Sequence, residues 1–432
     1  MNQKSLMIAH VITIGTELLI GDTVNTNATW IGLLLTERGL KCEKVITIGD
    51  EPDQIIDALD QSLKQANLTI MTGGLGPTHD DITKKCLASY FGVKMKRHEP
   101  TLQYIQDSFK KRNITFSRSN YGQADILENC DVMPNKAGTA PGMWFPGHNL
   151  AVLPGVPSEM KYLMKHEVAP RIKSTFPKLA GSYTRYFQLT GIGESTLSDL
   201  NLKEVSDYLN DQVDLAFLPH TSGITLRITS RARNRDEAKK RVRPFEDHIR
   251  RKAGEFIYSE EKDEELNLVV GRLLTENNRT LVTAESCTGG FVANYITNVD
   301  GSSSYFSGGI LAYSNAMKIK LLGVSENILK KYGAVSKPVA LQMAKAAAKN
   351  HDSDISISTT GIAGPGGGTA SKPVGTVWVG YWSKGDHFAV KLDLNKGRML
   401  NKERTAIIAL DIIRRKLNGI ENLPYGLQPE FP

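Results

Sequence analysis

Short apolar runs alternate with amphipathic runs through the first part of the chain. The apolar runs fit strands at 9–15, 44–48, 68–71, 143–145 and 150–153, and the amphipathic runs fit helices at 28–37, 52–65, 82–90 and 158–168. Strands that alternate with helices predict a mainly parallel sheet with helices on both faces, which is an α/β/α domain of three layers. Pro170 and Pro177 predict its end, so we place the first domain at 1–175.

The pattern changes beyond this point and predicts two further domains. Half-exposed strands at 183–190 and 223–230, with accompanying helices, predict a small α+β domain over 176–258. The acidic run 260–265 marks the next boundary, and α/β alternation resumes over 262–420. There we expect helices at 266–277, 291–297, 338–350 and 400–416 and strands at 280–283, 306–313, 355–359, 375–381 and 388–394. The proline-rich tail from Glu421 is expected to be a loose end.

Composition favours a cytoplasmic and soluble protein. The chain has 432 residues, 40% of them hydrophobic, which is enough for several buried cores. Its four cysteines are widely spaced and form no CxxC pair, which argues against a disulfide framework or a cysteine zinc site and favours a reducing compartment. The N-terminus lacks the pattern of a signal peptide, and no apolar run is long enough to span a bilayer.

The positive charge is concentrated in one segment. Between Arg227 and Lys252, eleven Lys or Arg residues stand against four Asp or Glu residues, and this excess equals the formal net charge of +7 of the whole chain. Such a segment could be a nucleic-acid surface. A solvated helix with charges on its outer face explains it more simply, so nucleic-acid binding is not our first expectation.

A first candidate site follows the strand at 68–71. The segment Thr72-Gly73-Gly74-Leu75-Gly76-Pro77-Thr78 is followed by Asp80 and Asp81 and opens a helix at the carboxyl edge of the sheet, where such folds bind ligands. The glycines allow close approach of a phosphate, and the two aspartates are oxygen ligands suited to a divalent ion. The alternative is a Gly/Pro turn in which an aspartate caps a helix.

Loops after other strands of the same sheet would reach the same crevice. They contribute Glu17, Asn25 and Asn27 near the first strand, and Gly155, Pro157 and Glu159 after the last one. Individually, the two glutamates could simply be charges at helix termini.

A second candidate site lies where the strand at 280–283 passes into the helix at 291–297. The segment Ala284-Glu285-Ser286-Cys287-Thr288-Gly289-Gly290 places a hydroxyl beside free backbone N–H groups and the positive end of a helix dipole. We therefore expect Ser286 to be a nucleophile that attacks a carbonyl, with Glu285, Thr288, Gly289 and Gly290 contributing to substrate binding. The alternatives are a serine that only caps a helix and a cysteine, Cys287, that packs.

Ser286 needs a base, and lysine is the available partner. The histidines of this domain do not follow strands, whereas Tyr313 ends the strand at 306–313 and Lys318 follows it. A desolvated lysine can be neutral enough to accept a proton, and the tyrosine could relay protons or orient Lys318. The loop after 355–359, with Thr360, Gly361 and Gly364, could hold a phosphate or an oxyanion. Arg398 and Arg404 could bind a phosphate.

These motifs resemble the CinA family, the competence/damage-inducible protein A family, over essentially the full length. The resemblance is carried by 72–78 with Asp80 and Asp81, by 283–290, by Tyr313-Ser314-Asn315 with Lys318, by 333–336 and by 361–365. It implies an N-terminal domain similar to molybdopterin-binding domains, a KH-like middle domain and a C-terminal amidase domain. The middle segment has no GXXG loop, so RNA binding is not expected there.

The resemblance also implies two activities. For the C-terminal domain it implies hydrolysis of nicotinamide mononucleotide to nicotinic acid mononucleotide and ammonia, with Ser286, Tyr313 and Lys318 as catalytic residues and no metal. For the N-terminal domain it implies cleavage of ADP-ribose to AMP and ribose 5-phosphate with a divalent metal such as Mg²⁺ or Co²⁺.

Two alternatives remain open from the sequence. The N-terminal domain could be a regulatory module that binds a pterin or a nucleotide, or the protein could be a competence factor associated with nucleic acid. A homodimer is expected, because α/β enzymes commonly form symmetric oligomers.

Overall fold

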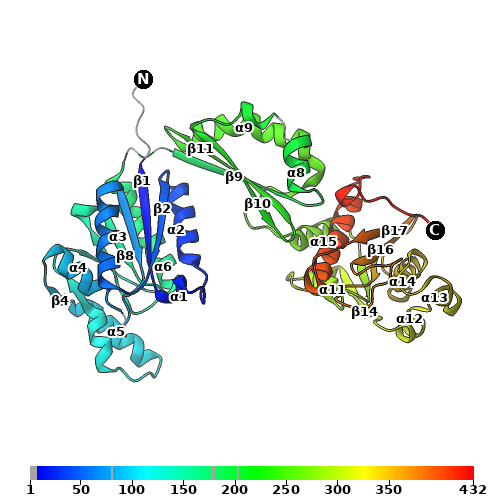
Figure 1. Ribbon diagram of the computed structural model, residues 1–432, viewed down its shortest axis with the longest axis horizontal. Coiled ribbons are helices and arrows are strands. Elements are labelled where there is room, and N and C mark those ends of the chain that lie inside the picture. Colours follow the sequence, from blue (N-terminus) through cyan, green and yellow to red (C-terminus); the bar gives the residue numbers. More distant parts are fainter. Residues whose placement is uncertain (1–6, 79–80, 178, 180, 202–203) are drawn as a thin grey trace. The chain divides into compact units, whose positions relative to one another are not determined.

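The structure is a computed structural model that describes residues 7–78, 81–177, 179, 181–201 and 204–432. The chain forms two compact units. The first consists of Met1–Tyr183 with Ser230–Arg241, and the second of Thr184–Thr229 with Val242–Pro432. Figure 1 follows the chain through them, from blue to red.

The first unit is built on a six-stranded sheet in the order β2-β1-β3-β8-β7-β6, in which β2, β1, β3 and β8 are parallel. The strands are β1 (Ile8–Ile14), β2 (Lys41–Ile48), β3 (Leu68–Thr72), β6 (Asp131–Met133), β7 (Gly142–Phe145) and β8 (Leu150–Leu153). Helices α2 (Thr26–Glu37) and α6 (Pro157–Leu163) pack on one face, and α3 (Pro52–Gln65) and α4 (Thr83–Phe91) on the other (Figure 1). The expected three-layer α/β/α domain is confirmed.

The edge strand β6 was not expected, and neither were two other features of this unit. A small excursion inserts β4 (Met95–Arg97), α5 (Glu99–Lys111) and β5 (Asp125–Leu127), with β4 and β5 paired antiparallel. The helix expected at 158–168 continues through a π turn, Met164–Val168, into α7 (Ala169–Thr175). Pro170 therefore does not end it, because it lies in the first turn after the wide π turn, where a missing N–H is tolerated.

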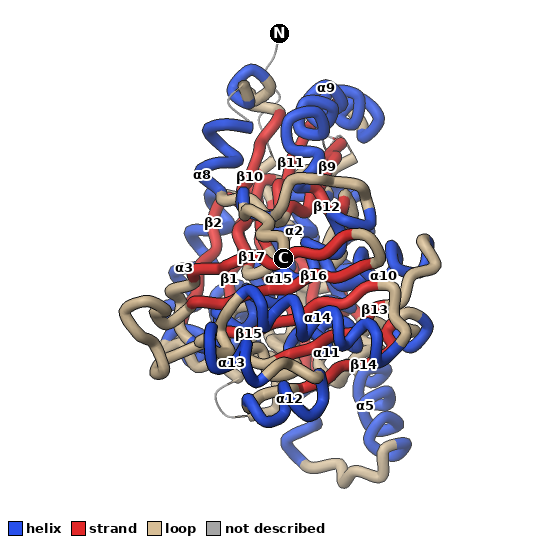
Figure 2. The backbone as a smooth tube through the Cα atoms, turned by 90° about the vertical axis from the view of Figure 1, so that its right-hand side faces the viewer, coloured by secondary structure: helices blue, strands red, loops and turns tan. Residues whose placement is uncertain are grey.

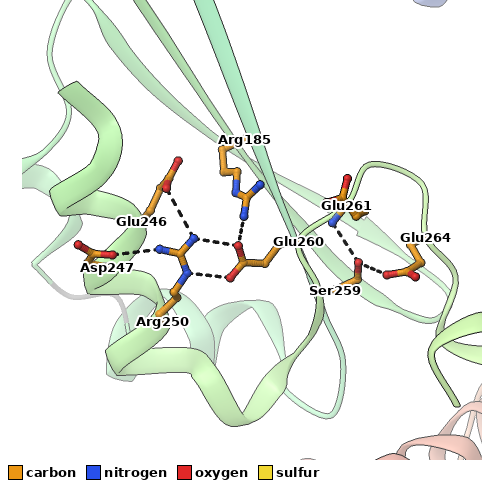
Figure 3. A network of polar contacts seen from close by, with 8 residues as sticks. All are labelled: Arg185, Glu246, Asp247, Arg250, Ser259, Glu260, Glu261 and Glu264. Atoms are coloured by element: carbon orange, nitrogen blue, oxygen red, sulfur yellow. Dashed lines mark hydrogen bonds and ion pairs between the residues drawn. The ribbon is translucent and has the colours of Figure 1, made fainter. Parts of the chain in front are cut away.

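The KH-like segment forms an antiparallel sheet in the order β10-β11-β9-β12, covered by α9 (Arg235–Ala253). The strands are β9 (Gly181–Leu189), β10 (Val213–His220), β11 (Gly223–Ala232) and β12 (Ile257–Ser259). Part of the basic charge is neutralised internally. Arg250 holds Glu260 through two bonds of 2.7 and 2.8 Å and also pairs with Asp247, and Arg185 binds the same Glu260 (Figure 3). The acidic segment that follows β12 is thus tied to this sheet and helix.

The C-terminal domain is a five-stranded mixed sheet in the order β14-β13-β15-β16-β17, seen as red strands in Figure 2. The strands are β13 (Leu281–Glu285), β14 (Phe306–Leu311), β15 (Ile355–Gly361), β16 (Thr376–Ser383) and β17 (Asp386–Asp393). Helices α10 (Leu266–Glu276), α11 (Phe291–Thr297) and α15 (Arg398–Leu417) share one apolar core with it, whereas α12 (Asn315–Leu322), α13 (Glu326–Tyr332) and α14 (Lys337–His351) contribute to a second.

The C-terminal tail is anchored, so the expectation of a loose end is wrong. The backbones of Glu430 and Ala389 exchange hydrogen bonds of 2.8 and 3.0 Å at the outer edge of β17, and the Tyr425 amide donates to the Gly191 carbonyl at 2.6 Å. Leu423 is buried in the core around α15. Prolines restrict the backbone of the tail, but pairing with an edge strand satisfies its polar groups.

Candidate active site

Ser286 lies directly after β13, at the carboxyl edge of the parallel part of the sheet. Its amide donates to the Thr359 carbonyl of β15 at 2.9 Å, which fixes the serine relative to the neighbouring strand. The residue is 7% exposed and lines a cavity. The position therefore combines a fixed backbone with access for a small molecule.

Lys318, on the first turn of α12, meets Ser286 in this cavity. Its Nζ lies 2.8 Å from Ser286 Oγ, 2.9 Å from the Ala312 carbonyl oxygen and 3.1 Å from the Tyr313 carbonyl oxygen. The side chain is 1% exposed, and burial lowers the pKa of its ammonium group. A neutral amine has two N–H groups and one lone pair. With the N–H groups on the two carbonyls, the lone pair faces Ser286 Oγ, as a general base requires.

Tyr313 contacts Lys318 through its backbone carbonyl and Arg398 through its phenol. Its carbonyl accepts from Lys318 Nζ and lies 3.3 Å from Ser286 Oγ, whereas its phenol oxygen accepts a bond of 3.0 Å from Arg398 Nη2. The Tyr313 residue is 58% exposed. In this structure the carbonyls of Ala312 and Tyr313 orient Lys318. The sequence had suggested the tyrosine side chain for this role.

The cavity has a volume of about 270 Å³, close to the lower end of the ~300–1,000 Å³ of small-molecule sites. The loop after β15 forms part of its wall. The lining residues that sequence reasoning had named are Ser286, Tyr313, Lys318, Thr360, Gly361, Gly364 and Arg398. Thr360 is itself buried and donates its hydroxyl to the Ala334 carbonyl at 2.8 Å, so it supports the wall.

Glu285 and Thr288 stabilise the motif from inside. The Glu285 carboxylate is 2% exposed and accepts hydrogen bonds of 2.8 to 3.1 Å from the amides of Gly290, Val292 and Ala293 at the start of α11. Thr288 is fully buried and donates to the same carboxylate at 2.7 Å. The positive end of α11 is therefore occupied by the protein's own acid, so the expectation that it holds substrate does not fit this arrangement.

Three other predicted neighbours also lie apart from the lining of this cavity. Gly289 and Gly290 adopt positive φ angles of 63° and 93°, which the turn into α11 requires. Arg404 lines a different, mainly apolar cavity of about 180 Å³ with Tyr425 and Leu427. Cys287, by contrast, does line the Ser286 cavity, but it is 7% exposed, and burial raises the pKa of its thiol to about 12, which disfavours the thiolate that a cysteine nucleophile needs.

A second cavity, of about 540 Å³, lies in the first unit at the carboxyl ends of β1 and β3. The predicted residues that line it are Gly73, Gly74, Leu75, Gly76, Asp81, Glu17, Gly155 and Glu159. The glycines allow tight packing, because a Cβ atom on Gly73 would lie 2.2 Å from the Ile14 carbonyl oxygen and one on Gly74 would lie 2.2 Å from Thr83 Oγ1. The loop is thus folded against β1 and α4.

The acids of this cavity are mostly engaged by the protein. The Asp81 carboxylate accepts from the Gly76 amide at 2.7 Å and from the Thr78 amide at 2.9 Å, and also from the Thr78 hydroxyl. Glu159 accepts from Asn135 Nδ2 at 2.7 Å, and burial raises the pKa of its carboxyl group. Asp80 lies outside the described residues.

The hydrogen bonds of these acids show whether their oxygens are free to bind the expected divalent metal. Within the described ranges, no three His, Cys, Asp or Glu side chains gather closely enough to hold an ion. Asp81 has both oxygens on N–H or O–H donors, and Asp50 accepts from the Thr16 amide at 2.9 Å. The described residues therefore fit a metal poorly, and we derive no catalytic step through one.

The remaining N-terminal residues have structural roles. Asn25 caps α2 by accepting from the Ala28 amide at 3.0 Å, and it donates to Thr13 Oγ1 at 2.8 Å. Asn27 Nδ2 donates to the Gly155 carbonyl at 2.7 Å, which ties two loops of the sheet edge together. Pro157 begins α6. Asn25, Asn27 and Pro157 are therefore not part of the cavity lining.

Sequence reasoning missed some residues of both cavities. Asp50, Asn120 and Gln123 line the N-terminal cavity, and Asn315 lines the one at Ser286. Asp50 follows β2 directly, so the rule that ligand sites gather at the carboxyl ends of parallel strands could have found it. Asn120 and Gln123 come from the excursion after α5, which no strand–helix pattern had indicated.

In the comparison with known proteins, separate family models match successive parts of the chain. Three family models match: "Probable molybdopterin binding domain" over 10–174, "Damage-inducible protein CinA KH domain" over 184–259 and "CinA C-terminal domain" over 263–417. A CinA-like protein of Chloroherpeton thalassium is 42% identical over 96% of this chain and 100% of its own length. The chain belongs to the CinA family.

Other relatives extend this likeness. A CinA-like protein of Kosmotoga olearia is 42% identical over 95% of this chain and 99% of its own length. A crystal structure of the competence/damage inducible protein CihA from Agrobacterium tumefaciens is 34% identical, covers 37% of this chain and 99% of that one, and has a TM-score of 0.34. Among the described helices, none is both long and apolar enough to cross a membrane.

Proposed function

We propose that the C-terminal domain of this CinA family member is an amidase that hydrolyses nicotinamide mononucleotide to nicotinic acid mononucleotide and ammonia. The observation that carries the proposal is the 2.8 Å contact between Lys318 Nζ and Ser286 Oγ, beside a cavity that can take a small molecule. The family resemblance of the motifs around these residues supports the choice of substrate. No metal is needed for this half of the enzyme.

In the proposed reaction, neutral Lys318 takes the proton of Ser286 as Oγ attacks the carboxamide carbon. The tetrahedral oxyanion accepts hydrogen bonds from backbone amides of the cavity wall. Lys318 then returns the proton to the nitrogen, the C–N bond breaks and ammonia leaves. Water attacks the resulting ester, with Lys318 again as base, and frees the acid and Ser286. Arg398 is the proposed partner of the substrate phosphate.

Ammonia release from nicotinamide mononucleotide by the full chain tests this proposal. Replacement Ser286→Ala removes the attacking atom and is expected to abolish turnover. The replacement Cys287→Ala is the matched control, because it removes the neighbouring buried thiol, and it should keep the activity. Turnover that survives Ser286→Ala would contradict the assignment.

For the N-terminal domain, we propose cleavage of ADP-ribose to AMP and ribose 5-phosphate. The family resemblance implies stimulation by a divalent metal such as Mg²⁺ or Co²⁺, for which the described residues alone offer a poor site. Support comes from the 540 Å³ cavity at the carboxyl edge of the sheet and from the family resemblance of its glycine loop. A chelator should remove ADP-ribose cleavage and leave ammonia release unchanged. Equal loss of both activities would contradict two independent sites, and binding of ADP-ribose without cleavage in any metal would favour a regulatory module.

The basic segment leaves a competence factor that binds nucleic acid as a second candidate. Its charge is partly paired, as Figure 3 shows for Arg250, so we rank it below the enzyme. A titration with DNA and RNA at several salt concentrations separates this candidate from the enzyme. Binding to an electrostatic surface weakens as salt rises, so binding that does not weaken would rule out such a surface. We also propose that the enzyme acts as a cytoplasmic homodimer, which light scattering of the purified chain would test for subunit number.

A further inference from the structure

The loop after β15, which forms part of the wall of the Ser286 cavity, is held by the first turn of α15 through two successive carbonyls. Asn401 Nδ2 donates to the Ala363 carbonyl at 3.0 Å, and Arg398 Nη1 donates to the Gly364 carbonyl at 2.7 Å. Asn401 is 1% exposed and does not line the cavity. The hydrogen bond from this buried side chain therefore fixes the orientation of one peptide group in the wall.

The orientation of the Asn401 amide is fixed by its other bond. Its Oδ1 accepts from the Lys396 amide at 3.1 Å, so the nitrogen must be the atom that faces Ala363. The backbone of Asn401 is fixed as well, because its amide donates to the Gly397 carbonyl at 2.9 Å and its carbonyl accepts from the Thr405 hydroxyl at 2.7 Å. The donor to Ala363 is thus preorganised.

The bond to Ala363 determines where the next amide points. In a planar trans peptide the C=O and N–H groups point in opposite directions, so a carbonyl turned toward Asn401 turns the Gly364 N–H away from α15. Gly364 lines the Ser286 cavity, and its N–H has no hydrogen-bond partner among the residues that the structure describes. The next residue, Pro365, has no N–H to offer.

We infer that the Gly364 N–H is a donor to the oxyanion formed at Ser286 and that Asn401 is the positioning residue that aims it. This inference rests on the amidase proposed above and names the donor that the proposal left open. A donor fixed before the reaction stabilises charge that develops in the transition state, because it needs no reorientation at that moment. Asn401 would therefore act on kcat rather than on substrate binding.

The replacement Asn401→Asp tests this role. The carboxylate still accepts from the Lys396 amide but repels the Ala363 carbonyl, so the peptide is no longer held. Loss of one oxyanion donor costs about 10²–10³ in kcat in other enzymes, and loss of its positioning should cost about 10- to 100-fold here, with KM changed by less than about twofold. Asn401→Ala, which removes the donor without adding charge, should act in the same direction if the aspartate variant folds poorly.

Asn267→Asp is the matched control. Asn267 is also buried, at 6% exposure, and its Nδ2 donates to a backbone carbonyl, that of Tyr295, at 2.8 Å, but it lies on α10 and away from the cavity lining. A purely structural role predicts similar losses of melting temperature and similar kcat values for the two variants. The inference predicts that kcat falls only for the Asn401 variants, and equal kcat values for both sites would overturn it.

A second readout uses pyridine-3-boronic acid as a probe that does not turn over. Ser286 Oγ adds to boron, the serine proton moves to Lys318, and a boron hydroxyl takes the place of the oxyanion. Binding of this adduct should weaken about 10-fold or more in Asn401→Asp and stay unchanged in Asn267→Asp. Wild-type enzyme that binds the boronate but releases no ammonia from nicotinamide mononucleotide would contradict the proposed substrate alone. Unchanged boronate affinity in Asn401→Asp would contradict the role of Asn401.

Discussion

The two glycine-bearing motifs of the chain look alike in sequence but differ in how their cavities are equipped. Each motif follows a parallel strand and leads into a helix, and each carries an acid whose oxygens are taken by local amides: Asp81 in one and Glu285 in the other. At Ser286, a buried lysine from a separate helix reaches the motif. At Gly73–Gly76, the surrounding acids Asp50 and Glu159 are held by protein donors. In both cases the motif itself provides backbone structure. The chemistry of each cavity depends on the side chains that other elements contribute to it.

The largest expected effect separates the two cavities completely. Replacement Lys318→Met keeps an unbranched chain but removes the base, so ammonia release should fall by about 10³-fold or more, since general-base catalysis contributes ~10²–10⁴ and the serine depends on it. Cleavage of ADP-ribose should be unchanged. Parallel assays of the full-length variant measure both, and a parallel fall in both rates would show that the cavities are not independent.

A pair of arginines on α15 sharpens the distinction between the Ser286 cavity and its surroundings. Arg398 lines that cavity and Arg404 lines the apolar one, although both seemed suited to phosphate in the sequence. Arg398→Gln should raise KM for nicotinamide mononucleotide by about 10- to 100-fold, because the loss of a hydrogen bond to a charged group weakens binding by about this factor. Arg404→Gln should change KM by less than roughly twofold. The reverse order of effects would place the phosphate elsewhere.

The pH dependence of the amidase tests whether Lys318 is a base. Burial lowers the pKa of Lys318 from 10.5, and the neutral form is the active one. Activity should therefore rise with pH, about tenfold per unit, up to a midpoint below 10.5, and level off above it. The kcat/KM of ammonia release measured across this range reports the value in the free enzyme. A rate that falls over the same range would require protonated Lys318 instead.

The smallest expected effects are losses of folding stability when Glu285 or Asp81, the two acids that bind nearby backbone amides, is replaced. Glu285→Gln should lower the free energy of unfolding of the C-terminal domain by about 2–4 kcal/mol, because a buried carboxylate that accepts three amides is replaced by a neutral group with one acceptor. Asp81→Asn should cost about 1 kcal/mol, because it weakens the hydrogen bonds that a partly exposed carboxylate accepts from the amides of Gly76 and Thr78. Denaturant unfolding followed by circular dichroism measures both, and a larger loss for Asp81→Asn would reverse this ranking.

Local signals predicted much of the fold. Helices α3 and α11 have the expected bounds, because Pro52 starts one and the Gly289-Gly290 pair precedes the other. The short α12 and α13 were missed because they bury few side chains each and are rich in lysine, and β4 and β5 because each has three residues. The tail was misjudged because strand pairing with Ala389 is a long-range contact that no local pattern encodes.

The candidate site was predictable in its reactive groups but not in its support. Ser286 and Lys318 could be chosen from their residue types after strands, and the structure brings them together. The contact between Lys318 and the Tyr313 carbonyl could not be foreseen, since backbone direction depends on the turn into α12. Asn401 carries no local signal either, because its role depends on a loop almost forty residues earlier in the chain.

The covalent intermediate tests the central claim most directly. Enzyme quenched with acid during turnover of nicotinamide mononucleotide can be digested and its peptides fragmented in a mass spectrometer. The account predicts a mass increase equal to that of the substrate minus ammonia, located on Ser286 and absent from Lys318→Met treated in the same way. An adduct located on Cys287, or on any residue other than Ser286, would contradict it.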